Sequence, residues 1–435
     1  MEPIALGMAN DQAPHGAGAP SGFVPLDVLG RRAKDASRVL ARASSAAKND
    51  ALEAAASSLE SHEDAILEAN AFDVARAETD ALSATVIDRL RLSRARLSLM
   101  AAGLRSVATL ADPVGEVIDG SVRPNGLRVR RVRAPLGVVG IVYENRPNVT
   151  SDAAGLCLKS GNAALLRGSA GAIESNKAVA AALREGVEKA GLPADAVVLV
   201  EDTSHETVAQ FVRLDRYIDC LIPRGGPSLV GLVREQASVP YVIDGDGNCH
   251  VYVDATADLD MAEAIVVNAK TQRPSVCNAM ETLLVHRDVA PAFLPRVAAA
   301  LAGVELRGDP ATCALVASAI PAVEDDFARE FLDLILAVAV VGDLDAAIAH
   351  ITTYSSGHSE AIVTSDLASA QRFTNEVDAA AVLVNASTRF VDGGELGLGA
   401  EIGISTQKLH ARGPLGLREL TSAKYVIEGA GQVRT

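Results

Sequence analysis

The chain has 435 residues, of which 49% are hydrophobic and 22% are charged, as expected for a folded protein of two or three domains. Forty Lys and Arg against 55 Asp and Glu give a net charge of −15, which excludes nucleic acid binding through bulk charge and requires a local basic site for any anionic ligand. The sequence has no membrane-length apolar run, no signal-peptide pattern and no paired motif among its five cysteines, so we expect a cytoplasmic protein with no membrane partner and no metal site.

The beginning of the chain is predicted to be a disordered tail followed by helices. Residues 1–22 are rich in Ala, Gly and Pro and show no periodicity. From about residue 25 to residue 110, apolar residues recur at helical spacing, as in Leu29, Ala33, Ala36 and Leu40. We therefore expect a mostly α-helical segment here.

A charged, alternating stretch follows the helices. Apolar residues and Arg alternate over residues 127–133, after the turn signal Pro124-Asn-Gly126, which predicts a β-hairpin within residues 117–135. Residues 424–433 near the end of the chain also read as a strand, but one with no obvious local partner.

Short Val- and Ile-rich runs then alternate with helical stretches, which is the pattern of doubly wound parallel sheets. The first series of predicted strands covers residues 138–142, 163–166, 197–200, 217–222, 241–243 and 251–253. The second series covers residues 282–285, 337–341, 361–364 and 381–384. With a boundary placed near residue 260, the sequence predicts two α/β domains.

Chemically reactive groups follow several of the predicted strands, where a doubly wound sheet binds its ligands. Asn145, Arg146 and Asn148 precede a predicted helix and suit an oxyanion or phosphate, although an ordinary strand-to-helix loop is the alternative. Lys159 in Lys-Ser-Gly-Asn162, Arg167-Gly168 and Pro223-Arg-Gly-Gly226 combine cations with glycines. They match neither standard nucleotide-binding motif, so surface arginines remain the alternative interpretation.

Cys277 is the predicted nucleophile. Its polar loop contains Lys270 and Arg273, whose charges are expected to lower the pKa of the thiol, although an inert buried cysteine is the alternative. Cys249 lies next to His250, but adjacent residues in a strand point to opposite faces, so this pair is discounted. Glu330, Arg389, His410 and Arg412 add charged groups that we expect to face one cleft with Cys277.

The stretch from Asn268 to Thr282 resembles the catalytic segment of the gamma-glutamyl phosphate reductases, also called glutamate-5-semialdehyde dehydrogenases, a family within the aldehyde dehydrogenase superfamily. The resemblance extends to Asp88-Arg-Leu90, Asp112-Pro-Val-Gly115, Arg146-Pro-Asn-Val-Thr150, Gly247-Asn-Cys-His250 and Arg412-Gly-Pro-Leu-Gly-Leu417. It implies an aldehyde-dehydrogenase-like α/β fold with two doubly wound domains and a small β extension. The chain is thereby divided into an NADPH-binding domain (residues 23–116 and 136–262), a catalytic domain (263–414) and an oligomerisation extension (117–135 and 415–435) that joins across subunits.

The same resemblance implies NADPH-dependent reduction of L-glutamyl 5-phosphate in proline biosynthesis, by a homo-oligomer that a glutamate 5-kinase supplies with its labile substrate. Cys277 becomes the nucleophile and Asn148, with Asn145 second, the oxyanion donor. The implied cofactor contacts are Arg167, Gly168 and Lys159 near the adenosine ribose, Pro223, Arg224, Gly225 and Gly226 at the pyrophosphate, and Glu330 at the nicotinamide ribose. The candidate substrate-binding residues are Arg146, Arg273, Arg389, Arg412 and His410.

One departure from the superfamily bears on the reaction. Hydrolytic aldehyde dehydrogenases carry a Glu that activates water, and residues 243–248 lack it, which favours phosphate as the acyl partner. The alternatives are an acylating or hydrolytic aldehyde dehydrogenase with another substrate, a thiol acyltransferase without a nicotinamide cofactor, and a catalytically silent scaffold.

Overall fold

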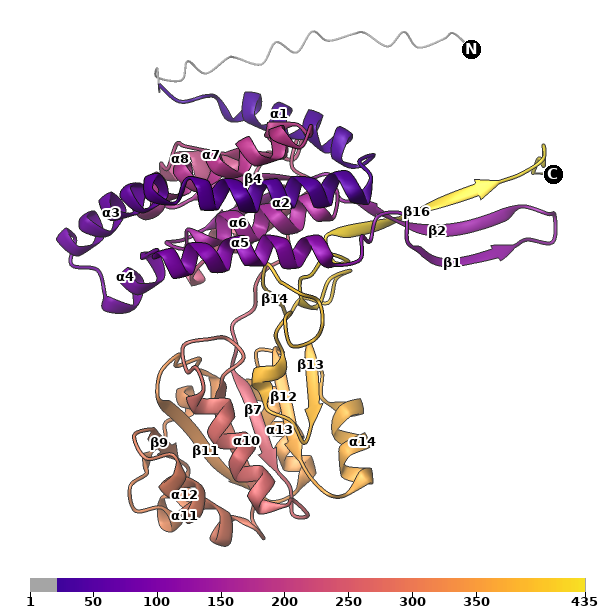
Figure 1. Cartoon of the computed structure of the whole chain (residues 1–435). Helices are drawn as coiled ribbons and strands as arrows, with labels where there is room; N and C mark the ends of the chain where they lie inside the picture. Colours follow the sequence, from indigo (N-terminus) through magenta and orange to yellow (C-terminus); the bar gives the residue numbers. More distant parts are fainter. Residues whose placement is uncertain (1–21, 435) are drawn as a thin grey trace, which may run out of the picture.

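A computed structural model of the chain describes residues 22–434, so the predicted tail lies outside the described residues except for Gly22. Figure 1 shows an upper domain that contains the N-terminal helices, a lower domain built from the later residues, and a β arm that extends sideways from the upper domain. None of the helices described is long and apolar enough to cross a membrane.

The predicted helical segment forms five helices in the upper domain. They are α1 (Leu26–Leu40), α2 (Ser45–Ser61), α3 (Glu63–Thr79), α4 (Ala84–Leu90) and α5 (Arg94–Thr109). Leu29, Ala33, Ala36 and Leu40 are all buried on one side of α1, which confirms the helical spacing seen in the sequence. Serine side chains cap the N-termini of α2, α4 and α5.

A four-stranded parallel sheet forms the centre of the upper domain, in the order β5-β4-β3-β6. Its strands are β3 (Val138–Tyr143), β4 (Ala163–Gly168), β5 (Val197–Leu199) and β6 (Cys220–Arg224). The accompanying helices are α6 (Asn148–Lys159), α7 (Ile173–Lys189), α8 (His205–Phe211) and α9 (Pro227–Gln236). With right-handed crossovers, α6 and α7 cover one face and α8 the other. The predicted strand at residues 241–243 makes only an isolated bridge between Tyr241 and Leu221.

The lower domain contains a seven-stranded parallel sheet in the order β10-β9-β11-β8-β7-β12-β13. Its strands are β7 (Cys249–Val253), β8 (Met280–His286), β9 (Glu305–Gly308), β10 (Ile320–Pro321), β11 (Ile335–Val341), β12 (Ser359–Val363) and β13 (Ala381–Val384). Its helices are α10 (Leu259–Thr271), α11 (Ala290–Ala300), α12 (Pro310–Leu315), α13 (Leu344–Tyr354) and α14 (Leu367–Glu376). Alternate residues of β7 enter two different apolar clusters, because the sheet has helices on both faces.

The predicted boundary between the two domains is wrong in position. β7 pairs with β8 and β12, so it belongs to the lower sheet and the chain crosses between the domains before residue 249. Alternation of strands and helices continues across the crossing, which is why the sequence pattern does not reveal it. The lower domain also ends before residue 414, since Ile402 and Ala411 pack into the core of the upper domain and Ile404–Ser405 (β14) pairs with Gly413–Pro414 (β15) beside it.

The arm is a three-stranded antiparallel sheet of β1 (Val117–Val122), β2 (Arg128–Pro135) and β16 (Thr421–Glu428) (Figure 1). The hairpin predicted from the alternating arginines is confirmed. The resemblance implies that the last strand joins across subunits. In the structure, this strand pairs with β2 of its own chain. Sequence proximity could not reveal this partner, because nearly 300 residues separate the two strands, as the pair Arg130 and Glu428 illustrates.

Candidate active site

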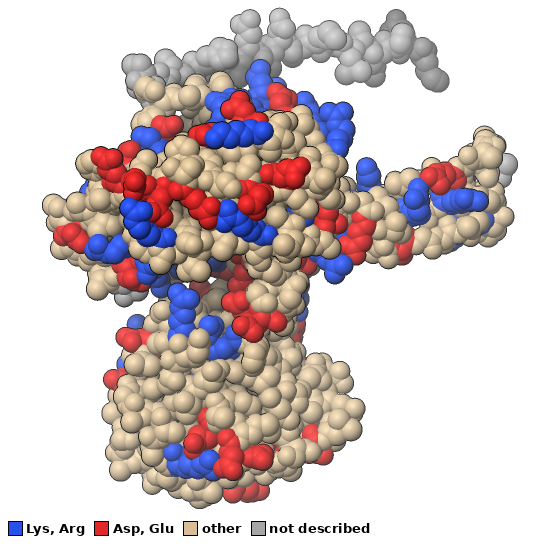
Figure 2. All heavy atoms as spheres, in the orientation of Figure 1, with Lys and Arg blue, Asp and Glu red and all other residues tan. Residues whose placement is uncertain are grey.

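The two parallel sheets meet through opposite ends. The carboxyl ends of β3, β4 and β6 lead into the junction between the domains, and the loops that precede β7, β8, β11 and β12 reach it from the other side. An ion pair between Arg224, at the end of β6, and Asp244, before β7, links the two sides. Figure 2 shows blue basic side chains gathered at this junction beside red acidic ones.

Cys277 lies in the loop before β8, with its side chain half-buried. The chain before β7 fixes its backbone. The Cys249 thiol donates to the Cys277 carbonyl at 3.2 Å, and a Cβ on Gly247 would lie 1.5 Å from that carbonyl oxygen, so only glycine fits. The imidazole nearest Cys249 is His358, at 3.7 Å, and not its neighbour His250. Cys249 therefore helps to hold the backbone at Cys277.

The expectation of a lowered thiol pKa is wrong for the protein without ligands. Burial raises the pKa of Cys277 to about 11; the charge of Arg224 opposes this, while Glu330 and Glu401 add to it. Lys270, which the sequence suggested as an activating cation, is instead fully buried against Glu281, with Nζ 2.6 Å from the carboxylate. The thiol is thus protonated near neutral pH and needs a proton acceptor before it can attack.

Two carboxyl groups act electrostatically on this thiol. Glu330 accepts a hydrogen bond from the Gly247 amide at 2.8 Å, and burial raises its pKa. Glu401 accepts from the Gly393 amide at 3.0 Å, and burial raises its pKa to about 7, with Asp392 adding to the shift. Glu401 can therefore exist in both protonation states near neutral pH, which suits a proton acceptor or donor.

Three of the predicted substrate-binding arginines gather on the same side of the site. Burial lowers the pKa of the half-buried Arg389; the charge of Asp392 opposes this shift, the charge of Arg273 adds to it, and Cys277 opposes it. Its Nε donates to Gln272 at 2.8 Å. Burial and the charge of Arg146 both lower the pKa of Arg224. The charge of Arg224 in turn opposes the rise in the pKa of Cys277. None of Arg146, Arg273 and Arg389 forms an ion pair within residues 22–434, so this group presents free positive charge.

The other two predicted substrate contacts are not free. Arg412 pairs with Asp378 at 2.9 Å, a carboxylate that also pairs with Lys408. His410 is exposed and hydrogen-bonds the Glu419 backbone carbonyl at 3.2 Å. The sequence shows a run of cations here but not the carboxylate that neutralises them, so Arg412 and His410 are withdrawn as substrate-binding candidates.

Asn148 is better placed than Asn145 as an amide donor. Asn148 is the first residue of α6 and is exposed, with one contact from its amide to Asp152 at 2.9 Å. Asn145 has a left-handed backbone, with φ 37°, and its side-chain oxygen accepts from Ser169 at 2.8 Å. Asn145 thus shapes the loop, which leaves Asn148 as the candidate.

Arg167 ends β4 in a largely buried position, with 7% of its surface exposed. Its guanidinium donates to the backbone carbonyls of Thr203 at 2.6 Å and Ser204 at 3.0 Å, so it holds the loop after β5. A Cβ on Gly168 would lie 2.1 Å from the side chain of Asn176, so packing alone already explains this glycine.

Lys159 does not lie at this edge, and its assignment to the cofactor is wrong. It ends α6, which runs back from the carboxyl end of β3, and so it lies at the opposite edge of the sheet. Only 1% of it is exposed, and its ammonium donates to Asn49 at 2.5 Å and to the Ala108 carbonyl at 2.7 Å. Its closeness to Arg167 in sequence is misleading, because Lys159 precedes β4 whereas Arg167 lies near the carboxyl end of that strand.

The residues from Pro223 to Gly226 join β6 to α9. Pro223 is buried within the sheet and Arg224 is engaged by Asp244, so the two glycines are the exposed part of the turn. A Cβ on Gly225 would meet the Glu144 carboxyl, but one on Gly226 would meet no atom within 4 Å. No packing contact within the described residues requires a glycine at Gly226, and the Gly226 amide donates to the Glu144 carboxylate at 3.2 Å, so an anionic ligand at the N-terminus of α9 would take the place of this carboxylate.

The site also contains residues that the sequence analysis missed: Arg89, Asp152, Glu281 and Glu401. Arg89 comes from the N-terminal helices and stands in the stretch Asp88-Arg-Leu90, which carries part of the family resemblance but has no role implied by it. Glu401 stands within the glycine-rich stretch of residues 392–403, which is the one signal that the sequence offers for it. Buried charges such as Lys270 and Glu281 give no signal at all in a single sequence.

Comparisons with known proteins agree with this architecture. The model of the aldehyde dehydrogenase family matches residues 26–320. The gamma-glutamyl phosphate reductase of Carboxydothermus hydrogenoformans is 57% identical over 408 residues, which cover 93% of this chain and 98% of that protein. The corresponding enzyme of Thermobifida fusca is 54% identical over 408 residues, with the same coverage of 93% and 98%.

Solved structures extend the comparison to the fold. The crystal structure of gamma-glutamyl phosphate reductase from Thermotoga maritima matches with a TM-score of 0.92 and 48% identity, over 94% of this chain and 100% of that one. An acetylating aldehyde dehydrogenase from Geobacillus thermoglucosidasius matches with a TM-score of 0.67 and 17% identity, over 94% and 97% of the two chains, which shows the shared fold alone.

Proposed function

Because the chain belongs to the aldehyde dehydrogenase family and, within it, to the gamma-glutamyl phosphate reductases, we propose that it reduces L-glutamyl 5-phosphate to L-glutamate 5-semialdehyde and phosphate, with NADPH, in proline biosynthesis. The family and the aldehyde-dehydrogenase-like fold expected from the sequence motifs are confirmed. The enzyme class that follows is an oxidoreductase with a nicotinamide cofactor.

One observation carries the proposal most directly. Cys277 lies near a group of arginines, of which Arg146, Arg273 and Arg389 form no ion pair within residues 22–434, in a protein whose net charge is −15. Like charges that gather at a junction are stabilised when an anion joins them. An acyl phosphate that also carries a carboxylate supplies two anionic groups beside one electrophilic carbon, which is the combination that a thiol and several cations can use.

The residues at the carboxyl edge of the upper sheet fit a dinucleotide. Gly226 leaves open space at the N-terminus of the ten-residue helix α9, where backbone N–H groups favour a pyrophosphate. Arg167 supports the loop after β5 and brings positive charge near the expected ribose, which is our basis for NADPH over NADH. Glu330 is the proposed contact to the nicotinamide ribose. When bound, the cofactor supplies the two reducing electrons.

In the proposed reaction, Glu401 or a phosphate oxygen accepts the proton of the Cys277 thiol. The thiolate attacks C5 of the substrate, the C–O bond to phosphate breaks, and a thioester remains on Cys277. Reduction of this thioester gives a thiohemiacetal, whose C–S bond breaks to release the aldehyde while the sulfur regains a proton. The amides of Cys277 and Asn148 are the proposed donors to each oxyanion, and Arg224 and Arg389 offset the charge of the departing phosphate.

The loop before β7 lacks the Glu of the hydrolytic relatives; its two carboxylates are Asp244 and Asp246, and the charge of Asp246 adds to the effect of burial in raising the pKa of Glu330. Asp244 stands in the stretch where hydrolytic relatives of the superfamily carry a Glu, but it is paired with Arg224 and accepts the Ile404 amide at 2.7 Å. A thioester that resists water persists until it is reduced or until phosphate takes the acyl group in the reverse direction. This supports phosphate as the acyl partner.

Three further parts of the proposal concern the surroundings of the enzyme. We propose a homo-oligomer that uses the arm, because β1 and β16 leave unpaired edges on a largely exposed sheet. We also propose a glutamate 5-kinase as the supplier of the labile acyl phosphate, and a cytoplasmic location.

The test is reduction of NADP⁺ by the purified enzyme with pyrroline-5-carboxylate, the cyclised form of glutamate 5-semialdehyde, with and without inorganic phosphate. We expect NADPH to form repeatedly only when phosphate is present; without phosphate, each active site should form at most one NADPH, together with the thioester on Cys277. Formation at the same rate without phosphate would favour a hydrolytic aldehyde dehydrogenase, and the absence of any cofactor reduction would favour a thiol acyltransferase or a scaffold.

A further inference from the structure

Arg89 joins the arginines of the site from an unexpected part of the chain. It lies near the end of α4, whereas Arg146 follows β3 and Arg273 precedes β8. Burial lowers the pKa of Arg89, and the charges of Arg146 and Arg273 lower it further, so the three guanidinium groups act on one another. They come from three separate segments, and such convergence of like charges is unfavourable without a bound anion.

The other arginines near Arg89 in sequence behave differently. Arg91 pairs with Glu78 at 2.8 Å, Arg94 pairs with Asp64 at 2.7 Å, and Arg96 pairs with Asp88 at 2.8 Å. Arg89 forms neither an ion pair nor a hydrogen bond within residues 22–434. It is thus the member of this run that remains available to a ligand.

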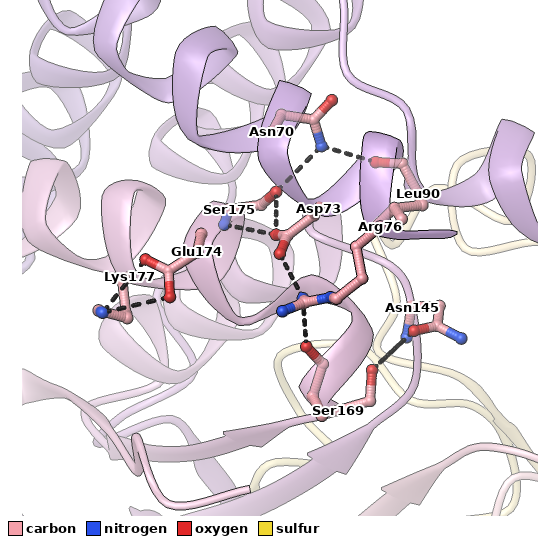
Figure 3. A network of polar contacts seen from close by, with 10 residues as sticks. Asn70, Asp73, Arg76, Leu90, Asn145, Ser169, Glu174, Ser175 and Lys177 are labelled. Atoms are coloured by element: carbon pink, nitrogen blue, oxygen red, sulfur yellow. Dashed lines mark hydrogen bonds and ion pairs between the residues drawn. The ribbon is translucent and has the colours of Figure 1, made fainter. Parts of the chain in front are cut away.

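The backbone that follows Arg89 is fixed by a buried asparagine. The Asn70 amide donates to the Leu90 carbonyl at 2.9 Å and accepts the Leu92 amide at 2.8 Å, and only 3% of Asn70 is exposed. Figure 3 shows that the Asn70 amide also donates to the Ser175 hydroxyl, with 3.0 Å between Nδ2 and Oγ. The Ser175 hydroxyl in turn donates to Asp73, with 2.7 Å between Oγ and Oδ2. The segment that carries Arg89 is therefore held in one position.

The same network reaches the carboxyl edge of the upper sheet. Arg76 bridges Asp73 at 2.7 Å and the Ala170 carbonyl at 2.6 Å, and Ala170 follows the end of β4 (Figure 3). Ser175 lies in the first turn of α7, which starts from the same loop. The helical segment is thus anchored to the loop after β4, so Arg89 keeps its position relative to the junction.

The arginines divide into two sets by the charges that act on them and on the reacting sulfur. The charges of Arg224 and Arg389 act on Cys277, so these two lie near C5 and the phosphate of a substrate attacked there. The leading charge effects on Arg89 come from Arg146 and Arg273 and not from Cys277. A glutamyl substrate has its second anion, the α-carboxylate, at the other end of its five-carbon chain.

We propose that Arg89 binds the α-carboxylate of the substrate and so selects an amino-acid acyl group over an aliphatic one. This inference rests on the proposed function, since it takes glutamyl phosphate as the substrate. A guanidinium on a backbone segment that Asn70 holds, and without an ion pair to a carboxylate within residues 22–434, is suited to a bidentate contact with a carboxylate.

The experiment compares Arg89→Met with Arg91→Met, a matched control that removes a surface arginine two residues away. Each is assayed in the oxidative direction with NADP⁺ and phosphate on pyrroline-5-carboxylate and on 1-pyrroline, the same ring without its carboxylate. Arg89→Lys serves as a second variant that keeps the charge, and thermal melting verifies that all variants fold.

For Arg89→Met we expect kcat/KM on pyrroline-5-carboxylate to fall about 10- to 100-fold, as for one lost charge-assisted contact. We expect the rate on 1-pyrroline and the KM for phosphate to stay within about twofold of the wild type, Arg89→Lys to lose less activity, and Arg91→Met to be unchanged. An equal fall on both ring substrates, a rise in the KM for phosphate, or no change at all would overturn the inference. A wild-type enzyme without phosphate-dependent activity would instead refute the proposed function.

Discussion

The upper and lower sheets contribute to the site from opposite ends, and the difference follows from how the chain connects them. After β6 the chain passes through α9 and the parallel bridge between Tyr241 and Leu221, and it then enters the amino end of β7, which runs away from the upper domain (Figure 1). A short crossing of this kind places carboxyl ends on one side of the junction and amino ends on the other. The rule that ligands bind at carboxyl ends of strands therefore applies to the upper sheet only.

The two edges differ in the charges that their backbones present. Helices that follow the strands of the upper sheet, such as α9, point their N-termini at the junction, which favours phosphate groups. At the lower sheet, α10 and α13 end near the junction, so their C-termini face it. C-termini disfavour anions. In the proposed function, side-chain cations such as Arg273 and Arg389 therefore bind the anion at the lower edge, whereas helix N-termini and glycines do so at the upper edge.

The largest effect is expected at Cys277. Cys277→Ser should lower kcat by more than about a thousandfold while leaving NADPH affinity nearly unchanged, because the nucleophile belongs to the lower edge and the cofactor to the upper. Cys249→Ser is the matched control, since it keeps a donor to the Cys277 carbonyl and should retain most activity. Steady-state kinetics and NADPH fluorescence titration measure both. An active Cys277→Ser enzyme beside a dead Cys249→Ser enzyme would reverse the assignment.

Removal of a cation from the lower edge should affect the substrate and spare the cofactor. We expect Arg389→Ala and Arg273→Ala each to weaken apparent substrate affinity by about 1.5–3 kcal/mol, the range for a hydrogen bond to a charged group. NADPH affinity should stay within about twofold. Matching losses for substrate and cofactor would mean that the two edges do not divide their tasks as described.

Two glycines of the upper edge separate a ligand effect from a packing effect. Gly226→Ala places its methyl group in open space, so we expect unchanged stability and a KM for NADPH raised about tenfold. Gly168→Ala forces a methyl group against buried Asn176, so it should cost about 1–3 kcal/mol of unfolding free energy. Denaturant unfolding and cofactor titration of both variants check this. Normal NADPH affinity in the Gly226→Ala enzyme would show that the pyrophosphate does not bind at this turn.

The smallest effect concerns the protonation of Cys277. Since Glu401 raises the thiol pKa, Glu401→Gln should lower it and speed alkylation of Cys277 by iodoacetamide at pH 8 about three- to tenfold. In the wild type, with a thiol pKa of about 11, the thiolate fraction and hence the rate should rise with pH from 8 to 10 without a plateau. Cys277→Ser provides the background from other cysteines. A wild-type plateau near pH 8 would show that the thiol is already activated.

The fold was largely predictable from local patterns. The helical spacing in α1, the arginine alternation in β2 and the apolar runs of β3, β8 and β11 each follow from one segment's own periodicity. The domain crossing and the pairing of β16 with β2 were not, because both depend on which distant segment a strand meets.

The site was predictable where chemistry is local and failed where charge is compensated from afar. Cys277 and the glycine turn at Gly226 stand out by residue type and spacing. By residue type and sequence position, Arg412 and Lys159 both resemble ligand-binding residues. In the structure, Arg412 is paired with Asp378, and α6 places Lys159 at the opposite edge of the sheet. Arg89 was missed for the converse reason, since its lack of a carboxylate partner becomes visible only in three dimensions.

The central claim is that Cys277 carries the acyl group and that phosphate removes it. Mass spectrometry of the enzyme mixed with pyrroline-5-carboxylate and NADP⁺, without phosphate, tests this directly. The account predicts one glutamyl adduct on the peptide that contains Cys277, its loss when phosphate is added, and no adduct in Cys277→Ser. An adduct on another cysteine, or none in an enzyme that reduces NADP⁺ under these conditions, would contradict it.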